Sequence, residues 1–201
     1  MKLFVSLAAL ALAAGMASAK DPVNGELLTG LNSGGTSPGG YTTRDLLVID
    51  VSGILSMDGF GDPDNVVQNY NIGANSHVTG IGWNVTLFAD SPSWLSEMSV
   101  AFQNSAQNAG VFLTPGVGDN ISGTKSYSSG GIVDLVGLGL DFNVDANGLL
   151  RVEFFEGFVD YNNDWDGIWQ SGALTIEYVV PAPGTAALLA TAGLVALRRR
   201  R

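Results

Sequence analysis

The chain has 201 residues, of which 46% are hydrophobic, and its 19 acidic and nine basic side chains give a formal net charge of −10. One globular domain with a substantial core fits this length, whereas a multidomain enzyme does not. The acidic balance argues against a nucleic-acid-binding surface, because carboxylates repel the phosphate backbone. Cysteine is absent and His77 is the only histidine, so a disulfide framework and a histidine-rich zinc site are excluded as well.

The first 19 residues have the pattern of a secretory signal peptide. Lys2 supplies a positive charge, residues 3–14 are apolar, and Ala17 and Ala19 form the small-residue pattern of a cleavage site. We therefore predict that residues 1–19 are removed and that the protein is exported. A buried N-terminal helix is the alternative interpretation of the same residues.

Residues 20–41 are rich in glycine, serine and proline, which predicts a flexible or loosely attached N-terminal segment. Beyond it, the apolar residues of 42–51, 77–88 and 94–102 recur at every second position, imperfectly in the first of these segments. This period of two is typical of half-buried strands, and no helical period persists in the region.

A β-hairpin is predicted within residues 140–154. Apolar residues alternate with polar ones on both sides of Asn147 and Gly148, which supply the positive backbone angles of a tight turn. Residues 171–180 alternate in the same way as a final strand. We therefore expect an all-β fold over residues 42–180, an antiparallel β-sandwich of seven to nine strands with jelly-roll-like topology. A signal peptide and a short C-terminal apolar helix would flank it.

The strongest candidate for a ligand site is the acidic segment "DYNNDWDGIW". Asp160, Asn162, Asp164 and Asp166 recur at every second position, and Gly167 allows the chain to reverse. Several hard oxygen ligands could therefore converge on one calcium ion, the only cofactor that the sequence suggests. The alternative is a solvated connection between strands, because turns use the same residue types.

Two further patterns bear on this hypothesis. Asp58, Asp62 and Asp64 form a second acidic group, which the surrounding glycines and proline also explain as a turn. Trp165 and Trp169 flank the first acidic segment, and exposed aromatic rings beside a bound cation commonly stack on sugars. Packing of one or both rings under the loop is the alternative.

No catalytic residue is predicted. His77 lies near the start of an expected strand, where a structural role is the more common one, and no serine lies in a G-x-S-x-G motif. Glu153 and Glu156 are three residues apart on an expected strand, so they should point to opposite faces and could not act together on one glycosidic bond.

The C-terminal residues 181–201 have three parts. A proline-bracketed turn precedes an apolar run over residues 185–197 and four arginines; the turn is Pro181, Ala182, Pro183 and Gly184, and the arginines are Arg198, Arg199, Arg200 and Arg201. As a helix the run would cover about 20 Å, less than a bilayer core. The arginines favour the cytoplasmic side of a membrane. An ordinary stop-transfer helix is the alternative.

This order of parts resembles the PEP-CTERM sorting signal of exported bacterial proteins, here in a "VPAPG" variant with Ala182 at the position of the usual glutamate. The stretches "GIGWNVTL", "SPSWLSEM" and "LRVEFFE" are similar to those of β-sandwich proteins that carry this signal. The resemblance implies an exosortase-like processing enzyme and the inner membrane as partners, with extracellular polysaccharide as a third. It implies a location in the cell envelope, at the cell surface or in the extracellular matrix of a bacterium, with transient or permanent membrane anchoring.

Residues 20–180 carry four basic side chains against all 19 acidic ones, a net charge of −15. Such a surface repels nucleic acid and anionic lipid and attracts cations. The sequence therefore favours a non-enzymatic, membrane-sorted surface or matrix protein associated with exopolysaccharide. A calcium-assisted carbohydrate-binding module is the alternative, and a secreted hydrolase is the least favoured class.

Overall fold

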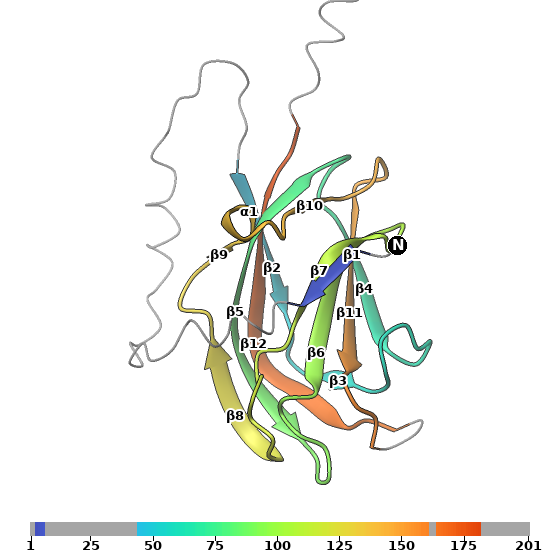
Figure 1. Cartoon of the computed structure of the whole chain (residues 1–201), viewed down its shortest axis with the longest axis vertical. Coiled ribbons are helices and arrows are strands. Elements are labelled where there is room, and N and C mark those ends of the chain that lie inside the picture. Colours follow the sequence, from blue (N-terminus) through green and yellow to red (C-terminus); the bar gives the residue numbers. More distant parts are fainter. Residues whose placement is uncertain (1–2, 7–43, 161–163, 182–201) are drawn as a thin grey trace, which may run out of the picture.

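The computed structural model describes residues 3–6, 44–160 and 164–181, which form two packed β-sheets with almost no helix (Figure 1). This architecture confirms the all-β prediction. The predicted cleavage site at Ala17 and Ala19, the segment 20–41 and the sorting residues from 182 onward lie outside the described residues. Pro181, the last described residue, is exposed.

Sheet A has five strands in the order β1 (Leu3–Ser6), β7 (Ala109–Leu113), β6 (Met98–Asn104), β11 (Leu149–Glu156) and β4 (Val66–Asn71). The edge strand β1 lies within the predicted signal peptide, so cleavage after residue 19 would leave the other four strands. Sheet B is built on the path β10 (Phe142–Asn143), β5 (His77–Ala89), β12 (Gly167–Val179) and β2 (Arg44–Asp50). Three short strands join this path: β3 (Ile54–Ser56) pairs with β12, whereas β8 (Gly123–Ser128) and β9 (Val133–Asp134) pair with β5. The helix α1 (Leu135–Leu138) is a single turn.

The core lies between the two sheets, where the predicted alternation points. Ile81, Val85 and Leu87 of β5 are buried on the inner face, as are Leu174 and Ile176 of β12. Strand pairing is antiparallel throughout the described sheets except between β1 and β7. The period of two in the sequence therefore reports a real division between inner and outer faces.

The predicted hairpin within residues 140–154 is wrong, although its turn is present. The Gly148 N–H donates to the Asp145 carbonyl at 2.9 Å, and Gly148 has a φ of 75°. The flanking strands do not pair with each other, because β10 joins β5 in sheet B and β11 joins β4 and β6 in sheet A. The turn connects the two sheets, so the local signal identified a reversal of the chain and not a strand pair.

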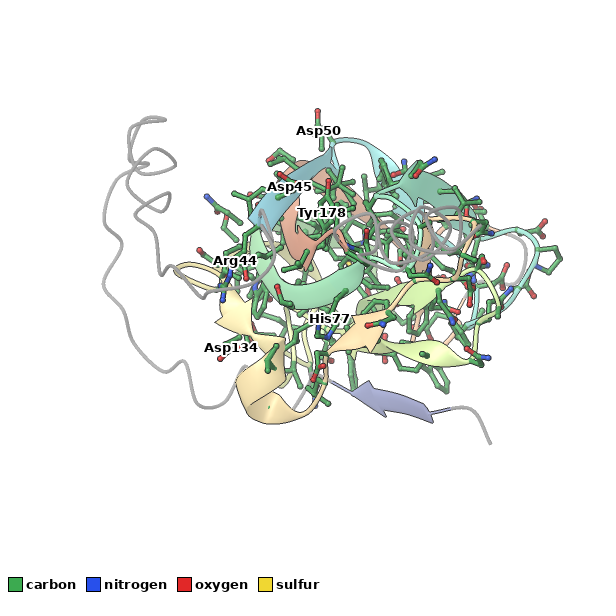
Figure 2. All side chains as sticks on the ribbon, turned by 90° about the horizontal axis from the view of Figure 1, so that it is seen from above. Arg44, Asp45, Asp50, His77, Asp134 and Tyr178 are labelled. Carbon is green, nitrogen blue, oxygen red and sulfur yellow. The ribbon has the colours of Figure 1, made fainter. Side chains whose placement is uncertain are left out.

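The long strands define two ends of the sandwich. At one end, Val179 of β12 pairs with Arg44 of β2 and His77 of β5; at the other, Gly167 of β12 pairs with Ala89 of β5. We call these the Val179 end and the Gly167 end. Figure 1 shows them at the top and bottom of the molecule, and Figure 2 looks onto the Val179 end.

No helix within residues 3–6, 44–160 and 164–181 is long and apolar enough to cross a membrane. The predicted apolar helix over 185–197 lies outside these ranges.

Candidate functional site

Three loops meet at the Gly167 end and bring most of the candidate ligands together. They span residues 57–65, 90–97 and 157–166, the last including residues 161–163 outside the described part. Backbone hydrogen bonds tie the loops and the adjoining strand ends to one another: Asp90 N to Asp166 O (2.9 Å), Gly157 N to Glu97 O (2.8 Å) and Glu156 N to Asp58 O (2.9 Å). Acidic residues that are distant in sequence therefore share one end of the fold.

The predicted calcium segment is only partly assembled as expected. The Asp160 N–H donates to the Asp166 Oδ2 at 2.8 Å, and Asp166 is fully buried at the start of β12. Asp164 is exposed, and its Oδ1 accepts a hydrogen bond from the Trp165 N–H at 2.8 Å. Asn162 lies outside the described residues. The structure thus brings Asp160 and Asp166 together and turns Asp164 toward solvent.

Glu156, at the end of β11, is the most unusual carboxylate of this region. Its side chain is 2% exposed, and neither oxygen has a hydrogen-bond partner within the part of the chain that the structure describes. The nearby Ser56 hydroxyl donates to the Phe155 carbonyl at 3.3 Å. A buried carboxylate without partners is costly, because it loses its hydration and gains nothing in return.

The electrostatic surroundings of Glu156 are acidic. Burial raises the pKa of the Glu156 carboxyl to about 9. The nearby Ser56 hydroxyl opposes part of this rise, whereas three neighbouring carboxylates add to it through like-charge repulsion, those of Asp166, Glu97 and Asp160. Negative charge is therefore concentrated around a side chain that is removed from water.

The second acidic group forms the tighter cluster. Asp58, Asp62 and Asp64 each offer a carboxylate oxygen, and these three atoms lie within 4.8 Å of one another. Burial raises the pKa of Asp58, and the carboxylates of Asp62 and Asp64 raise it further. The Asp62 Oδ1 also accepts a hydrogen bond from the Asp64 N–H at 3.0 Å, which is the turn geometry that the sequence suggested.

Glu153 holds the loop that carries this cluster. Its carboxylate is fully buried and accepts hydrogen bonds from the Gly61 N–H at 2.6 Å, the Asn65 side chain at 2.9 Å and the Arg151 guanidinium. Its role is structural, because the contacts with Gly61 and Asn65 fix the loop against sheet A and Arg151, on the same strand, balances its charge.

The aromatic rings of the Gly167 end differ from those predicted. Trp169 cannot stack on a sugar, because it is fully buried in the core, where its ring meets Phe154 edge to face with centroids 5.2 Å apart. Trp165 is half-buried, with its ring centroid 6.3 Å from that of Phe88. Two rings that the sequence did not single out are exposed instead: Trp94 by 42% and Phe158 by 62%.

The catalytic candidates do not assemble into a hydrolase site. The His77 Nε2 lies 2.7 Å from the Asp141 Oδ2, near the Val179 end. Glu153 and Glu156 lie on opposite faces of β11, because the first contacts the 57–65 loop and the second lies near Ser56 and Asp166. This placement agrees with their spacing in the sequence.

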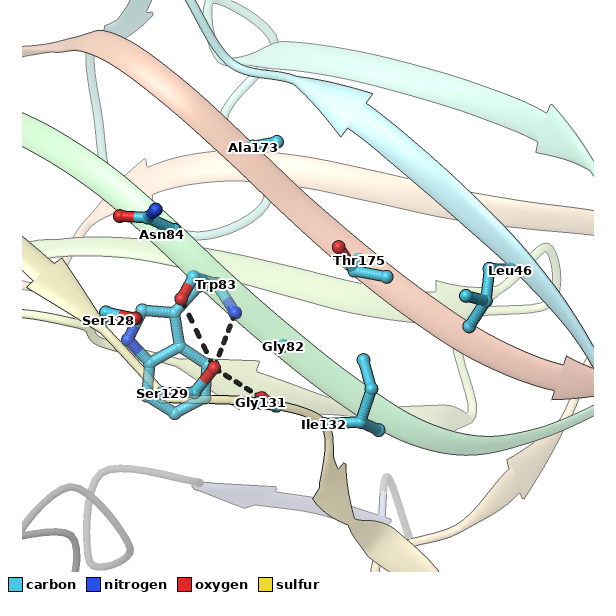
Figure 3. Close-up of a pocket in the computed structure, with 10 residues that line it drawn as sticks. All are labelled: Leu46, Gly82, Trp83, Asn84, Ser128, Ser129, Gly131, Ile132, Ala173 and Thr175. Carbon is cyan, nitrogen blue, oxygen red and sulfur yellow. Dashed lines mark hydrogen bonds between the residues drawn. The ribbon is translucent and has the colours of Figure 1, made fainter. Parts of the chain in front are cut away.

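A shallow groove of about 300 Å³ lies on the outer face of sheet B (Figure 3). The residues that line it are Leu46, Gly82, Trp83, Asn84, Ser128, Ser129, Gly131, Ile132, Ala173 and Thr175. The Ser129 hydroxyl fixes the loop over β5 by contacts with the Trp83 backbone and the Gly131 carbonyl. None of the lining residues is acidic or basic, so the groove offers no charged group for catalysis.

The chain matches no protein-family model and no curated protein. Among solved structures it is similar to virus capsid proteins. An infectious bursal disease virus VP2 subviral particle is 8% identical, with 69% of this chain and 33% of that chain aligned and a TM-score of 0.34. The cyanophage Pam1 capsid asymmetric unit is 14% identical, with 83% and 99% aligned and a TM-score of 0.37. The chain thus spans about a third of the VP2 chain, and these similarities assign it no activity.

Sequence reasoning did not place four residues of this end in a binding site: Glu97, Trp94, Phe158 and Glu156, which it considered only as a catalytic partner of Glu153. For Glu156 a signal was present, because it continues the inward-facing alternation of Leu150, Val152 and Phe154. The other three lie in loops, where sequence periodicity carries no information about burial.

Proposed function

We propose that this chain is an exported, membrane-sorted and non-enzymatic protein of a bacterial surface or extracellular matrix, associated with exopolysaccharide. Its scaffold is a jelly-roll-like β-sandwich, because consecutive strands pass repeatedly from one sheet to the other, as from β4 to β5 and from β5 to β6. The resemblance of residues 181–201 to a PEP-CTERM signal supports the sorting route.

The observation that carries the proposal is the position of the tail relative to the acidic loops. The sorting segment begins two residues after Val179, and the acidic segment precedes Gly167, so the two are attached to opposite ends of β12. A strand of this length spans about 40 Å at about 3.3 Å per residue. A domain held at the membrane by its tail would therefore present the Gly167 end outward.

The strand pairing at the Val179 end is compatible with attachment of the domain through its tail. β12 lies between β5 and β2, so the strand that precedes the tail is paired along both of its edges. Arg44, labelled in Figure 2, adds a side-chain contact at this end, because its guanidinium donates to the Glu177 carboxylate at 3.1 Å. A force applied to a tail attached here would be transmitted to both neighbouring strands.

The test is to express the full chain in a bacterium with an exosortase and in the matched strain without it. Intact-mass analysis of the exported protein should show loss of residues 1–19 and of the C-terminal apolar segment only when the exosortase is present. Replacement of both Pro181 and Pro183 by alanine should block the C-terminal cleavage. The control is Pro63→Ala, an exposed proline of the domain. Cytosolic protein with an uncleaved N-terminus would overturn the proposal.

Carbohydrate binding at the Gly167 end, assisted by calcium, is the second candidate. Two exposed aromatic side chains, Trp94 and Phe158, favour this candidate. They lie on neighbouring loops, and a hydrogen bond from the Gly157 N–H to the Glu97 carbonyl joins these loops. Exposed aromatic rings provide the flat apolar faces on which sugar rings stack.

Binding of the full chain to polysaccharide arrays, with calcium present, tests this candidate. Replacing Trp94 and Phe158 together by alanine should abolish binding, whereas Val48→Ala should not. Val48 is a suitable control because it is 58% exposed on β2, away from these loops. Equal binding by the double variant and the wild type would exclude this surface.

A further inference from the structure

The Glu156 carboxylate has no cationic partner in the described part of the protein. The basic side chains there are engaged elsewhere: Arg44 with Glu177, Lys125 with Asp119 and Arg151 with Glu153. His77 lies near the other end of the sandwich, beside Asp141. The negative charge around Glu156 is therefore not neutralised by these groups.

A bound cation would stabilise the buried Glu156 carboxylate better than protonation would. A protonated carboxyl still needs an acceptor for its O–H, and neither Glu156 oxygen has a partner among the described residues. A metal ion would instead engage the carboxylate oxygens directly and would offset the repulsion between Glu156 and the buried Asp166.

We propose that Glu156 and Asp166 are the principal ligands of a calcium ion bound between the 90–97 and 157–166 loops. Asp160 and Glu97 complete the acidic surroundings at the edge of this site. One Glu97 oxygen already accepts bonds from the Ser93 hydroxyl (3.1 Å) and the Trp94 N–H (2.8 Å). The proposal does not depend on export or sorting, and it differs from the sequence prediction by placing a residue of β11 at the centre of the site.

The chemistry of the donors favours calcium over other ions. All of the groups are carboxylates, hard oxygen ligands that suit calcium and magnesium. Zinc would be expected to use histidine or cysteine, and the chain has no cysteine. Calcium tolerates irregular ligand sets on loops, whereas magnesium demands a regular octahedron and retains its waters.

The experiment uses the full chain and calcium chloride alone as the probe. Thermal unfolding is followed with chelator, with calcium at about 1 mM, the range of extracellular calcium modules, and with magnesium at the same concentration. Calcium should raise the Tm of the wild type by several degrees, and magnesium should not. Isothermal titration should show one site.

The decisive variant is Glu156→Gln, which keeps the shape of the side chain and removes its charge. The calcium-dependent rise in Tm should disappear, and calcium affinity should fall at least tenfold, while the Tm in chelator should equal or exceed that of the wild type. A merely structural glutamate would give a lower Tm in chelator. Asp160→Asn provides a second variant at a half-buried position, with a smaller expected loss of affinity.

The matched control is the other acidic group. Asp62→Asn combined with Asp64→Asn removes charge from the Asp58 cluster, and this variant should keep the full calcium response. Loss of the response in this control, with its retention in Glu156→Gln, would move the ion to the 57–65 loop and overturn the assignment. The absence of any calcium response in the wild type would overturn the site itself.

Discussion

Glu153 and Glu156 lie three residues apart on one strand, both buried, and their surroundings are opposite. Glu153 accepts hydrogen bonds from a guanidinium, an amide side chain and a backbone N–H, whereas both Glu156 oxygens lack partners among the described residues. Buried carboxylates in this fold therefore differ in whether they are hydrogen-bonded. A fully bonded one fixes a loop, and an unbonded one within an acidic region is the basis of the proposed calcium site.

The largest expected effect is that of Glu153→Gln. It leaves Arg151, which is 15% exposed, without its counterion and weakens the bond to the Gly61 N–H. Breaking one partner of a buried pair costs about 3 kcal/mol of unfolding free energy. Urea denaturation measures this loss, and Asp64→Asn, at an exposed position of the same loop, is the control. A loss no larger than that of the control would remove the contrast with Glu156.

The substitution Phe60→Ala tests whether apolar contacts also hold the 57–65 loop against sheet A. The Phe60 ring meets Phe112 and Phe155 edge to face, with centroids 4.9 and 5.3 Å apart. Because Phe60 is half-buried, we expect a loss of about 2 kcal/mol, below the range for a fully buried ring. The measurement is again urea denaturation, with Phe60→Leu as the conservative comparison. A loss as small as that of an exposed residue would leave Glu153 as the main support of the loop.

Glu156→Gln should have the opposite sign in chelator. Replacing an unpartnered buried carboxylate by a neutral side chain of the same shape should raise the unfolding free energy by about 1 kcal/mol at pH 7. Urea denaturation of the two Gln variants in one buffer compares Glu153 and Glu156 directly. Destabilisation by both would show that Glu156 is also a structural residue.

Asp145 supplies an intermediate case and a pH dependence. The Ser105 hydroxyl (2.6 Å) and the Ala106 N–H (2.8 Å) donate to its carboxylate and lower its pKa. A lowered folded-state pKa means that the stabilisation is present above the unfolded value and is lost as the pH falls through the folded value. Asp145→Asn should therefore cost about 1 kcal/mol at pH 7 and progressively less below about pH 4. Denaturation at several pH values measures it, and a constant difference would contradict the assignment.

The inner faces of the sheets could be predicted from sequence, and the outer faces could not. Alternation in the second half of β5 and in β12 follows from burial on one side, whereas every residue of β6 is buried, so its outward-facing residues are covered as well. Glu153 looked like a solvent-facing residue of the same pattern, yet the 57–65 loop covers it. The sequence around Glu153 contains no signal that a loop from about 90 residues earlier in the chain covers this side chain.

The same limit applies to the candidate site. The spacing of Asp160 and Asp166 suggested ligands, and the structure brings these two together, but Asp164 faces solvent. Trp169 was indistinguishable in sequence from an exposed ring, because its burial depends on Phe154 of the opposite sheet. Long-range packing, which sequence periodicity does not encode, decided both outcomes.

The pairing of β12 along both edges has a mechanical consequence. If the tail after Val179 anchors the domain and the Gly167 end holds a ligand, tension runs along β12 between its two ends. The force then acts parallel to the strands, so the hydrogen bonds that join β12 to β5 and β2 are loaded together in shear and do not break one at a time. Such an arrangement suits a protein that must remain folded and bound to its ligand under mechanical tension.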